Sequence, residues 1–264
     1  MTLFQSFILG IVQGVTEFLP ISSSGFLILV PELFGWGVQD LAFDAFIHLA
    51  TLTAVIVALW SEVRSIMDAF QNPKKEGSGR WRRLVVWILI STLPVLVIGF
   101  LAKDLIETSL RSTTVVAWSF IIWGTVLYAA DRRAKRSKGL VTDVKPKHMF
   151  LIGLAQAIAL IPGTSRSGIT ITSGLFLGLS RETAARFSFL LALPVTAAVG
   201  LYKFLGILSG SVAISFGPLL IGFITAFFTA LLTIKVLLEF LKRYSFTEIA
   251  VFRVLVGFLI LLLG

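Results

Sequence analysis

Two ionisable residues stand in parts of the chain that are otherwise apolar. Glu17 comes shortly before Pro20 and three consecutive serines, Ser22–Ser24, whereas Arg166 lies within the short polar run Pro162–Gly168. A charged side chain inside a membrane is costly unless it is paired or faces a polar cavity, and such residues mark binding or catalytic sites. The two residues therefore indicate a site that acts on a charged ligand.

Arg166 has the sharpest chemical character of the two. A planar guanidinium with five N–H donors, together with hydroxyls and with backbone N–H groups beside glycine, is a phosphate-binding arrangement. If the run opens the following helix, the helix N-terminus adds partial positive charge. The neighbouring hydroxyl side chains, which we expect to bind phosphate with it, are Thr164, Ser165 and Ser167. The alternative is a structural ion pair with Glu17, which is compatible with a functional role.

Glu17 is expected to face the interior of a helix bundle, because a carboxylate in contact with lipid would be neutralised or expelled. Its chemistry suits either a divalent cation or a general base, and a purely structural role stays open. Gln13 lies four residues earlier, on the same face of a helix. An amide at that place is as often a contact between helices as a ligand.

The run Ser22–Ser24 supplies three hydroxyls close to Glu17. They are suited to bind phosphate, and one of them can act as a nucleophile if a neighbouring base accepts its proton. For any single serine the alternative is a structural role, in which its polar side chain only helps to form a turn in a buried loop. Asp44 and His48 form a further pair, four residues apart, which predicts either a local hydrogen bond or an acid–base group at the mouth of the site.

These residues belong to two copies of one pattern, Gly10–Gly25 and Gly153–Gly168. The copies align without a gap and share identical residues at Gly10/Gly153, Gln13/Gln156, Ser22/Ser165, Ser24/Ser167 and Gly25/Gly168. In each copy an apolar helical run reaches a proline and a polar loop that ends in glycine. Each half of such a run is too short to cross about 30 Å of hydrocarbon. We predict re-entrant helical hairpins at about 3–30 and 149–179, with a single kinked spanning helix as the alternative.

The composition indicates an integral membrane protein built from helices. Of the 264 residues, 56% are hydrophobic and only 14% are charged, less than the surface of a soluble domain requires. The chain has no cysteine, which excludes thiol catalysis and cysteine–metal sites. The net charge of +9 does not indicate nucleic-acid binding, because lysine and arginine gather in a few loops between apolar runs.

The placement of these charges predicts the topology. Basic residues gather in the polar loops 62–83 and 131–147 and at Lys242 and Arg243, which we assign to the cytoplasm. Spans are predicted at about 40–60, 84–101, 115–130, 184–205, 218–238 and 247–263. One span separates the first hairpin from the first basic loop, whereas the second hairpin directly follows the second basic loop. The hairpins therefore enter from opposite faces.

The predicted fold is an all-α polytopic membrane protein. It has six transmembrane helices and two re-entrant helical hairpins in one membrane domain, residues 1–264. The halves 1–140 and 141–264 form an inverted-topology repeat, and both termini lie outside. Discontinuous helices in such repeats meet near the midplane of the bilayer, where ligands bind.

The two motifs also resemble a known family. Gln13-Gly-Val-Thr-Glu17-Phe-Leu-Pro-Ile-Ser-Ser-Ser-Gly25 and Pro162-Gly-Thr-Ser-Arg-Ser-Gly-Ile-Thr170 together resemble the undecaprenyl-diphosphate phosphatases, the bacitracin-resistance proteins. The resemblance extends over Ala185–Pro194 and Ile221–Phe227 and covers the whole chain. It implies an enzyme of the cytoplasmic membrane that removes the terminal phosphate of undecaprenyl diphosphate on the outer side. The product is the carrier lipid for cell-wall synthesis.

The resemblance further implies roles for individual residues. Gln13 and Glu17 match the family's acidic motif, in which the first position is Glu or Gln. Ser23 is the candidate nucleophile of the serine loop, and Arg166 is the phosphate-binding arginine. A divalent cation, Mg²⁺ or Ca²⁺, is expected with Glu17.

One position departs from the family pattern. After the glycine of the serine loop the family usually has a histidine, and this chain has Phe26. A mechanism that uses that histidine cannot operate here. Either His48 replaces it, or Glu17 with metal and Ser23 suffices, or this member is impaired.

We therefore predict metal-assisted hydrolysis of a lipid diphosphate. The alternative is a transporter or flippase of polyprenyl phosphate, since inverted repeats with broken helices are typical of secondary transporters. Anion binding alone requires an arginine loop but no glutamate and serines opposite it. These additional groups favour the enzyme. The expected partners are the polyprenyl diphosphate and the bilayer, with no nucleic acid, and a homodimer stays open.

Overall fold

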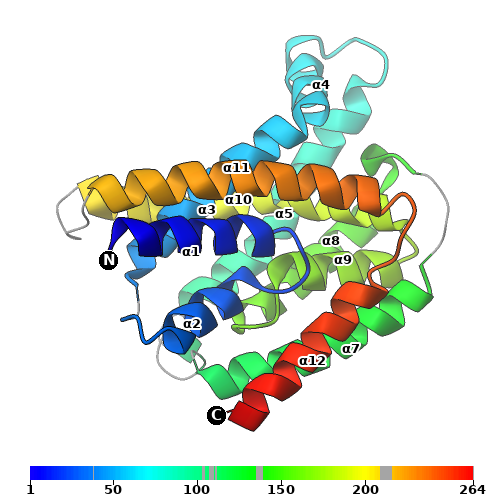
Figure 1. The fold of residues 1–264 in the computed structure, drawn as a ribbon. Coiled ribbons are helices and arrows are strands. Elements are labelled where there is room, and N and C mark those ends of the chain that lie inside the picture. Colours follow the sequence, from blue (N-terminus) through cyan, green and yellow to red (C-terminus); the bar gives the residue numbers. More distant parts are fainter. Residues whose placement is uncertain are drawn as a thin grey trace.

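The computed structural model describes residues 1–37, 39–102, 105–106, 110, 112–134, 139–208 and 216–263. Throughout these residues the regular structure is helical and no strand occurs (Figure 1). The all-α prediction is confirmed. Residues 135–138 of the second predicted basic loop lie outside the described residues.

Among the described residues, helices occur throughout both halves of the chain by residue number, 1–140 and 141–264. The first half contains α1 (Leu3–Thr16), α2 (Ser23–Leu33), α3 (Leu41–Ala58), α4 (Trp60–Gln71), α5 (Ser78–Leu101) and α7 (Thr113–Arg132). The second half contains η1 (Val141–Asp143), α8 (Pro146–Gln156), η2 (Ala157–Leu160), α9 (Arg166–Phe176), α10 (Arg181–Leu208), α11 (Phe216–Phe240) and α12 (Thr247–Leu263), where η denotes a 3-10 helix.

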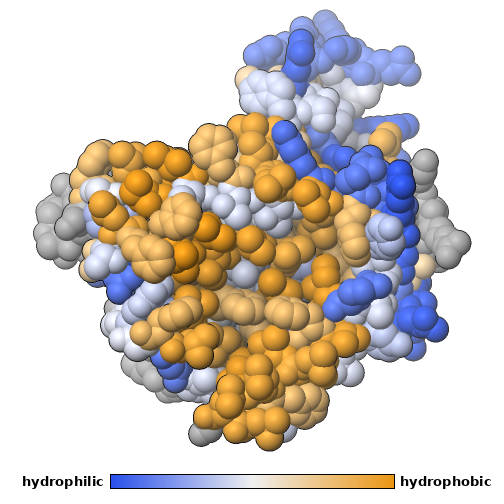
Figure 2. All heavy atoms as spheres, viewed as in Figure 1, coloured by the Kyte–Doolittle hydropathy of each residue, from blue (hydrophilic) through white to orange (hydrophobic). Residues whose placement is uncertain are grey.

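The lengths and the apolar surface of the helices are those of a multi-pass membrane protein. Among the described residues, α5, α7, α10 and α11 are long and apolar enough to span a bilayer, and α3 passes only together with α4, with a bend of 77° between them. The last helix, α12, has 17 residues and is about 25 Å long. Figure 2 shows a broad apolar surface over the bundle, with hydrophilic atoms concentrated on α4 and along one side.

The first basic loop was predicted wrongly in part. The stretch 62–83 was expected to be a polar loop, but it contains most of α4 and the start of α5. Apolar residues recur at one-turn spacing from Val63 to Phe70, so α4 is an amphipathic helix although it also carries charged side chains. Only residues 72–77 connect the two helices.

The predicted hairpins are broken helices that pack against the opposite half of the chain. At 1.5 Å per residue, α1 and α2 are about 21 and 17 Å long, each shorter than the bilayer core. Helix α1 packs against α11, and α8 packs correspondingly against α5. Glycine permits the close contact of the helices in both pairs. A Cβ atom at Gly10 would lie 1.9 Å from the Thr225 hydroxyl, and one at Gly153 would lie 2.2 Å from the Ser91 carbonyl. Further contacts across the halves join α3 with α10 and α11, and α7 with α12.

Candidate active site

The two polar loops have the same local geometry. Ser22 and Ser165 have φ angles of 79° and 72°, and they are the non-glycine residues with positive φ in the described parts of the chain. Each is the N-cap of the next helix: the Ser22 hydroxyl accepts from Gly25 N–H at 3.3 Å and the Ser165 hydroxyl from Gly168 N–H at 3.0 Å. Non-glycine residues in this region are strained and concentrate at functional sites. The loops therefore place the first residues of α2 and α9 in defined positions.

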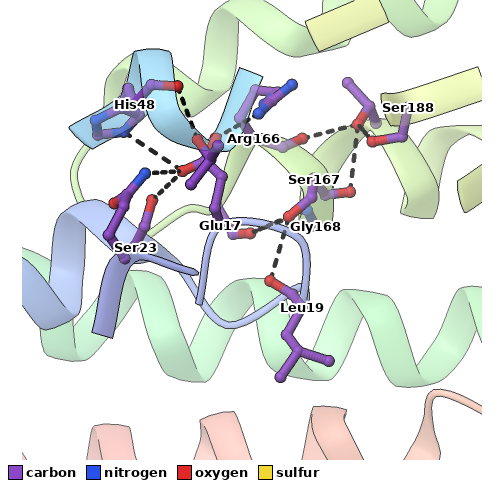
Figure 3. Close-up of polar contacts among 12 residues, drawn as sticks. Glu17, Leu19, Ser23, His48, Arg166, Ser167, Gly168 and Ser188 are labelled. Atoms are coloured by element: carbon purple, nitrogen blue, oxygen red, sulfur yellow. Dashed lines mark hydrogen bonds and ion pairs between the residues drawn. The ribbon is translucent and has the colours of Figure 1, made fainter. Parts of the chain in front are cut away.

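The side chains of both loops converge on the carboxylate of Glu17 (Figure 3). Oε1 accepts a hydrogen bond from Arg166 Nη2 at 2.5 Å, and Oε2 accepts from Ser23 Oγ at 2.6 Å. Oε2 also accepts from Gln13 Nε2 at 3.0 Å and lies 3.4 Å from Nε2 of His48. Glu17 is buried, with 7% of its surface exposed. One carboxylate thus contacts an arginine, a serine hydroxyl and an imidazole.

His48 is oriented by its own helix. Its Nδ1 lies 2.6 Å from the backbone carbonyl of Asp44, one turn earlier in α3. Because a carbonyl only accepts, Nδ1 donates and carries a proton, which leaves Nε2 as the nitrogen that exchanges a proton beside Glu17. This is the arrangement of an acid–base group in contact with a carboxylate.

Phe26 lies in a different environment from the site. Its ring packs against Phe120 and Phe252, at centroid distances of 5.6 and 6.4 Å. Phe26 is not among the residues that line the cavity beside Glu17, whereas His48 is. The chain therefore has His48 at the carboxylate, whereas Phe26, where the resemblance implies a histidine, packs elsewhere.

A cavity of about 430 Å³ adjoins these side chains. Its polar lining comes from Glu17, Ser22, Ser23, Ser24, Asp44, His48, Gln156, Ser165, Arg166 and Thr196. Its apolar lining includes Leu27, Ile28, Val95, Leu160, Val195 and Val199. This size and this mixture of many apolar groups with a few convergent polar ones are typical of small-ligand sites.

The remaining predicted phosphate-binding residues fall into two groups. Ser22, Ser24 and Ser165 line the cavity. Gln13, Thr164 and Ser167 are buried behind it and are not among the lining residues. Ser167 connects the two loops, because its Oγ donates to the Leu19 carbonyl at 3.2 Å (Figure 3). Phosphate binding by all six residues stays a prediction.

Sequence analysis missed Arg253. This arginine of α12 is fully buried, and its Nη1 donates to the Pro20 carbonyl at 2.9 Å. Its Nη2 donates to the carbonyls of Gly163 and Thr164, each also at 2.9 Å. Arg253 therefore links the loop after Glu17 to the loop before Arg166. The sequence did contain the indication, because an arginine within a predicted span needs buried partners just as an arginine in a membrane-embedded loop does.

The fit of a divalent cation depends on Glu17. The described residues contain no group of three or more His, Cys, Asp or Glu side chains suited to a metal. Near Glu17 the oxygen ligands that line the cavity are its carboxylate and the Ser23 hydroxyl. Mg²⁺ commonly binds one or two carboxylates and substrate phosphate oxygens. The residues therefore fit a cation whose remaining ligands come from a bound phosphate.

Comparison with known proteins agrees with the resemblance in the motifs. Residues 6–259 match the family described as Bacitracin resistance protein BacA. The chain is 42% identical to undecaprenyl-diphosphatase 1 of Pseudoalteromonas translucida, over 97% of each chain. It is 44% identical to undecaprenyl-diphosphatase of Alteromonas mediterranea, over 99% of this chain and 98% of the relative. The chain therefore belongs to the BacA family of bacitracin resistance proteins.

Proposed function

We propose that this protein hydrolyses undecaprenyl diphosphate to undecaprenyl phosphate and inorganic phosphate, and so recycles the carrier lipid for cell-wall synthesis. The observation that supports this most directly is the convergence of Ser23, Arg166 and His48 on Glu17 beside a cavity. The names of the relatives support the same reaction.

Arg166 is suited to bind the terminal phosphate of the substrate. In the structure its guanidinium donates to Glu17 Oε1 and lines the cavity. Its several N–H donors allow it to contact phosphate oxygens and to stabilise charge on the transferred phosphoryl group. Glu17 thus keeps the guanidinium in position before the substrate arrives.

Ser23 is the nucleophile in this mechanism. Its hydroxyl already donates to Glu17 Oε2, so the carboxylate accepts the proton as Oγ attacks the terminal phosphorus. An Oγ–P bond forms, the bond from phosphorus to the bridging oxygen breaks, and undecaprenyl phosphate leaves. A water molecule then attacks the phosphoserine, and Nε2 of His48 accepts its proton. The Oγ–P bond breaks, Glu17 returns its proton to Ser23 Oγ, and inorganic phosphate is released.

A divalent cation, Mg²⁺ or Ca²⁺, is part of the proposal. Glu17 and Ser23 Oγ would hold it, and when bound it would neutralise charge on the diphosphate. Its binding is measurable apart from turnover, because calcium should raise the midpoint of thermal unfolding in the wild type and not in Glu17→Gln.

The proposed topology is that of an inverted repeat in the bacterial cell membrane. Six spans and two re-entrant hairpins, with halves 1–140 and 141–264, would place both termini and the active site on the outer side. The matched packing of α1 on α11 and α8 on α5 supports this arrangement, as do the basic loops. A homodimer stays a prediction.

The reaction is tested by measuring phosphate release from undecaprenyl diphosphate by the purified protein in detergent, with Mg²⁺, with Ca²⁺ and with a chelator. Release that matches the formation of undecaprenyl phosphate is expected. A folded protein that releases no phosphate, but moves a fluorescent polyprenyl phosphate across proteoliposomes, would instead support transport. Transport needs no nucleophile, so the contact between Ser23 and Glu17 favours hydrolysis.

A further inference from the structure

Gln156 is a buried amide that has no hydrogen-bond partner. It is the last residue of α8 and is fully buried. Neither Nε2 nor Oε1 has a hydrogen-bond partner among the described residues. An unsatisfied buried amide destabilises the folded protein, and in a native structure it requires an explanation.

The internal repeat explains why the partner is missing. Gln156 corresponds to Gln13, and Leu160 corresponds to Glu17 in the ungapped alignment of the two motifs. In the first half, Gln13 Nε2 donates to the Glu17 carboxylate at 3.0 Å. In the second half the amide is kept, but the carboxylate is replaced by a leucine. The donor that Gln13 uses inside the protein is thus unused at Gln156.

The position of Gln156 indicates what its amide binds. It lines the same cavity as Arg166 and Ser165. The nearby lining on η2 and α5, which includes Ala159, Leu160 and Val95, is apolar. Helix α8, which ends at Gln156, contacts both α9, which begins at Arg166, and the apolar η2. No hydrogen bond from the described residues holds the Gln156 amide in one orientation.

We propose that Gln156 binds the lipid-linked phosphate of the diphosphate, with Nε2 as donor to a phosphate oxygen. This inference rests on the proposed function. The terminal phosphate lies with Ser23 and Arg166, and the apolar wall contacts the first carbons of the lipid chain. The phosphate between them lies beside Gln156. The amide is thus a binding residue that recognises a diphosphate, and it takes no part in bond breaking.

The test compares Gln156→Leu with the wild type. Loss of one hydrogen bond to a charged group should raise KM for undecaprenyl diphosphate about 10- to 100-fold. The value of kcat should fall less than KM rises, about 10-fold at most, because this phosphate is already charged in the ground state and gains only part of its final charge as the bridging bond breaks. The midpoint of thermal unfolding should be unchanged or higher, since an apolar side chain replaces an unsatisfied amide.

Ser91→Ala is the matched control. Ser91 in α5 is also fully buried with an unpartnered hydroxyl, but it is not among the residues that line the cavity. Its replacement should leave KM unchanged. Gln156→Glu provides a second variant, because it keeps the shape of the side chain and places a carboxylate beside phosphate. It should raise KM more than the leucine variant does.

Wild-type KM in Gln156→Leu, or a lowered unfolding temperature with unchanged KM, would overturn the inference, because the amide would then have a structural role. Failure of the proposed function is recognised separately, as absence of turnover in the wild type. In that case, binding of a methylene-bridged diphosphonate of the same lipid, measured on wild type and Gln156→Leu, still tests the amide. Equal affinities of the two proteins would reject the proposed role of Gln156.

Discussion

Ser23 and Arg166 occupy equivalent positions in the two repeated motifs, and both donate hydrogen bonds to one carboxylate. Ser23 is the first residue of α2 and contacts Oε2 of Glu17 at 2.6 Å, whereas Arg166 is the first residue of α9 and contacts Oε1 at 2.5 Å. The two halves thus use the same backbone geometry for different chemistry. One half presents a hydroxyl and the other an anion-binding group.

Replacement of Arg166 should abolish most activity. In Arg166→Ala we expect kcat to fall about 100- to 1,000-fold, the usual loss when a donor that stabilises transition-state charge is removed. Arg166→Lys should restore little of it, because an ammonium lacks the planar set of donors. Phosphate release from undecaprenyl diphosphate measures the effect. Arg80→Ala is the control, since Arg80 is exposed and lies 3.7 Å from Asp143 outside the cavity. Wild-type turnover in Arg166→Ala would reject the proposed role.

The neighbouring serines should differ sharply in their effects. Ser23→Ala removes the proposed nucleophile and should lower kcat at least about 1,000-fold. Ser24→Ala should lower it less than about 10-fold, because the hydroxyl of Ser24 lies 3.2 Å from that of Ser22 and only helps to bind phosphate. Acid quenching followed by mass spectrometry should detect phosphate on Ser23 in the wild type. Equal losses in both variants would contradict the assignment.

His48 should provide the acid–base group that the resemblance implies at the position of Phe26. In His48→Gln we expect kcat to fall about 100-fold, with loss of one limb of the pH–rate profile, because an amide cannot exchange a proton. Phe26→His should not rescue this variant, because Phe26 packs against Phe120 and Phe252 away from the cavity lining. Recovery of activity in the double variant would show that the usual family position still reaches the substrate.

The sequence predicted which residues form the site better than it predicted how they are arranged. Glu17 and Arg166 were identified because a charge in an apolar run needs a partner, and the repeated motif brought them together. By residue type alone the three consecutive serines could not be told apart, and only the resemblance singled out Ser23. In the structure Ser23 directly follows Ser22, which has a positive φ, and contacts the carboxylate.

Two further features were missed for opposite reasons. The charges of α4 concealed its amphipathic spacing, so the region was taken for a loop. The apolar residues around Arg253 concealed a buried arginine, so the region was taken for an ordinary span. Both errors arise when a segment is judged by its overall apolar content, which ignores the position of each residue on its helix.

Arg253 should act as a positioning residue for both loops. Arg253→Met would leave the carbonyls of Pro20, Gly163 and Thr164 without their guanidinium donor. Because buried carbonyls without donors are costly, we expect the midpoint of thermal unfolding to fall by several degrees. The distance between Glu17 and Arg166 should also become less well defined, which lowers kcat about 10- to 100-fold.

Arg253→Lys separates positioning from stability. A lysine keeps a charged donor for one or two of the carbonyls but cannot connect both loops as the guanidinium does. We expect it to recover much of the unfolding temperature and little of kcat, with KM near the wild-type value. Arg243→Met, at an exposed position after α11, should change none of these quantities. If kcat recovers in parallel with stability in Arg253→Lys, the arginine only supports the fold, because a positioning role requires the two loops to be held at a fixed separation.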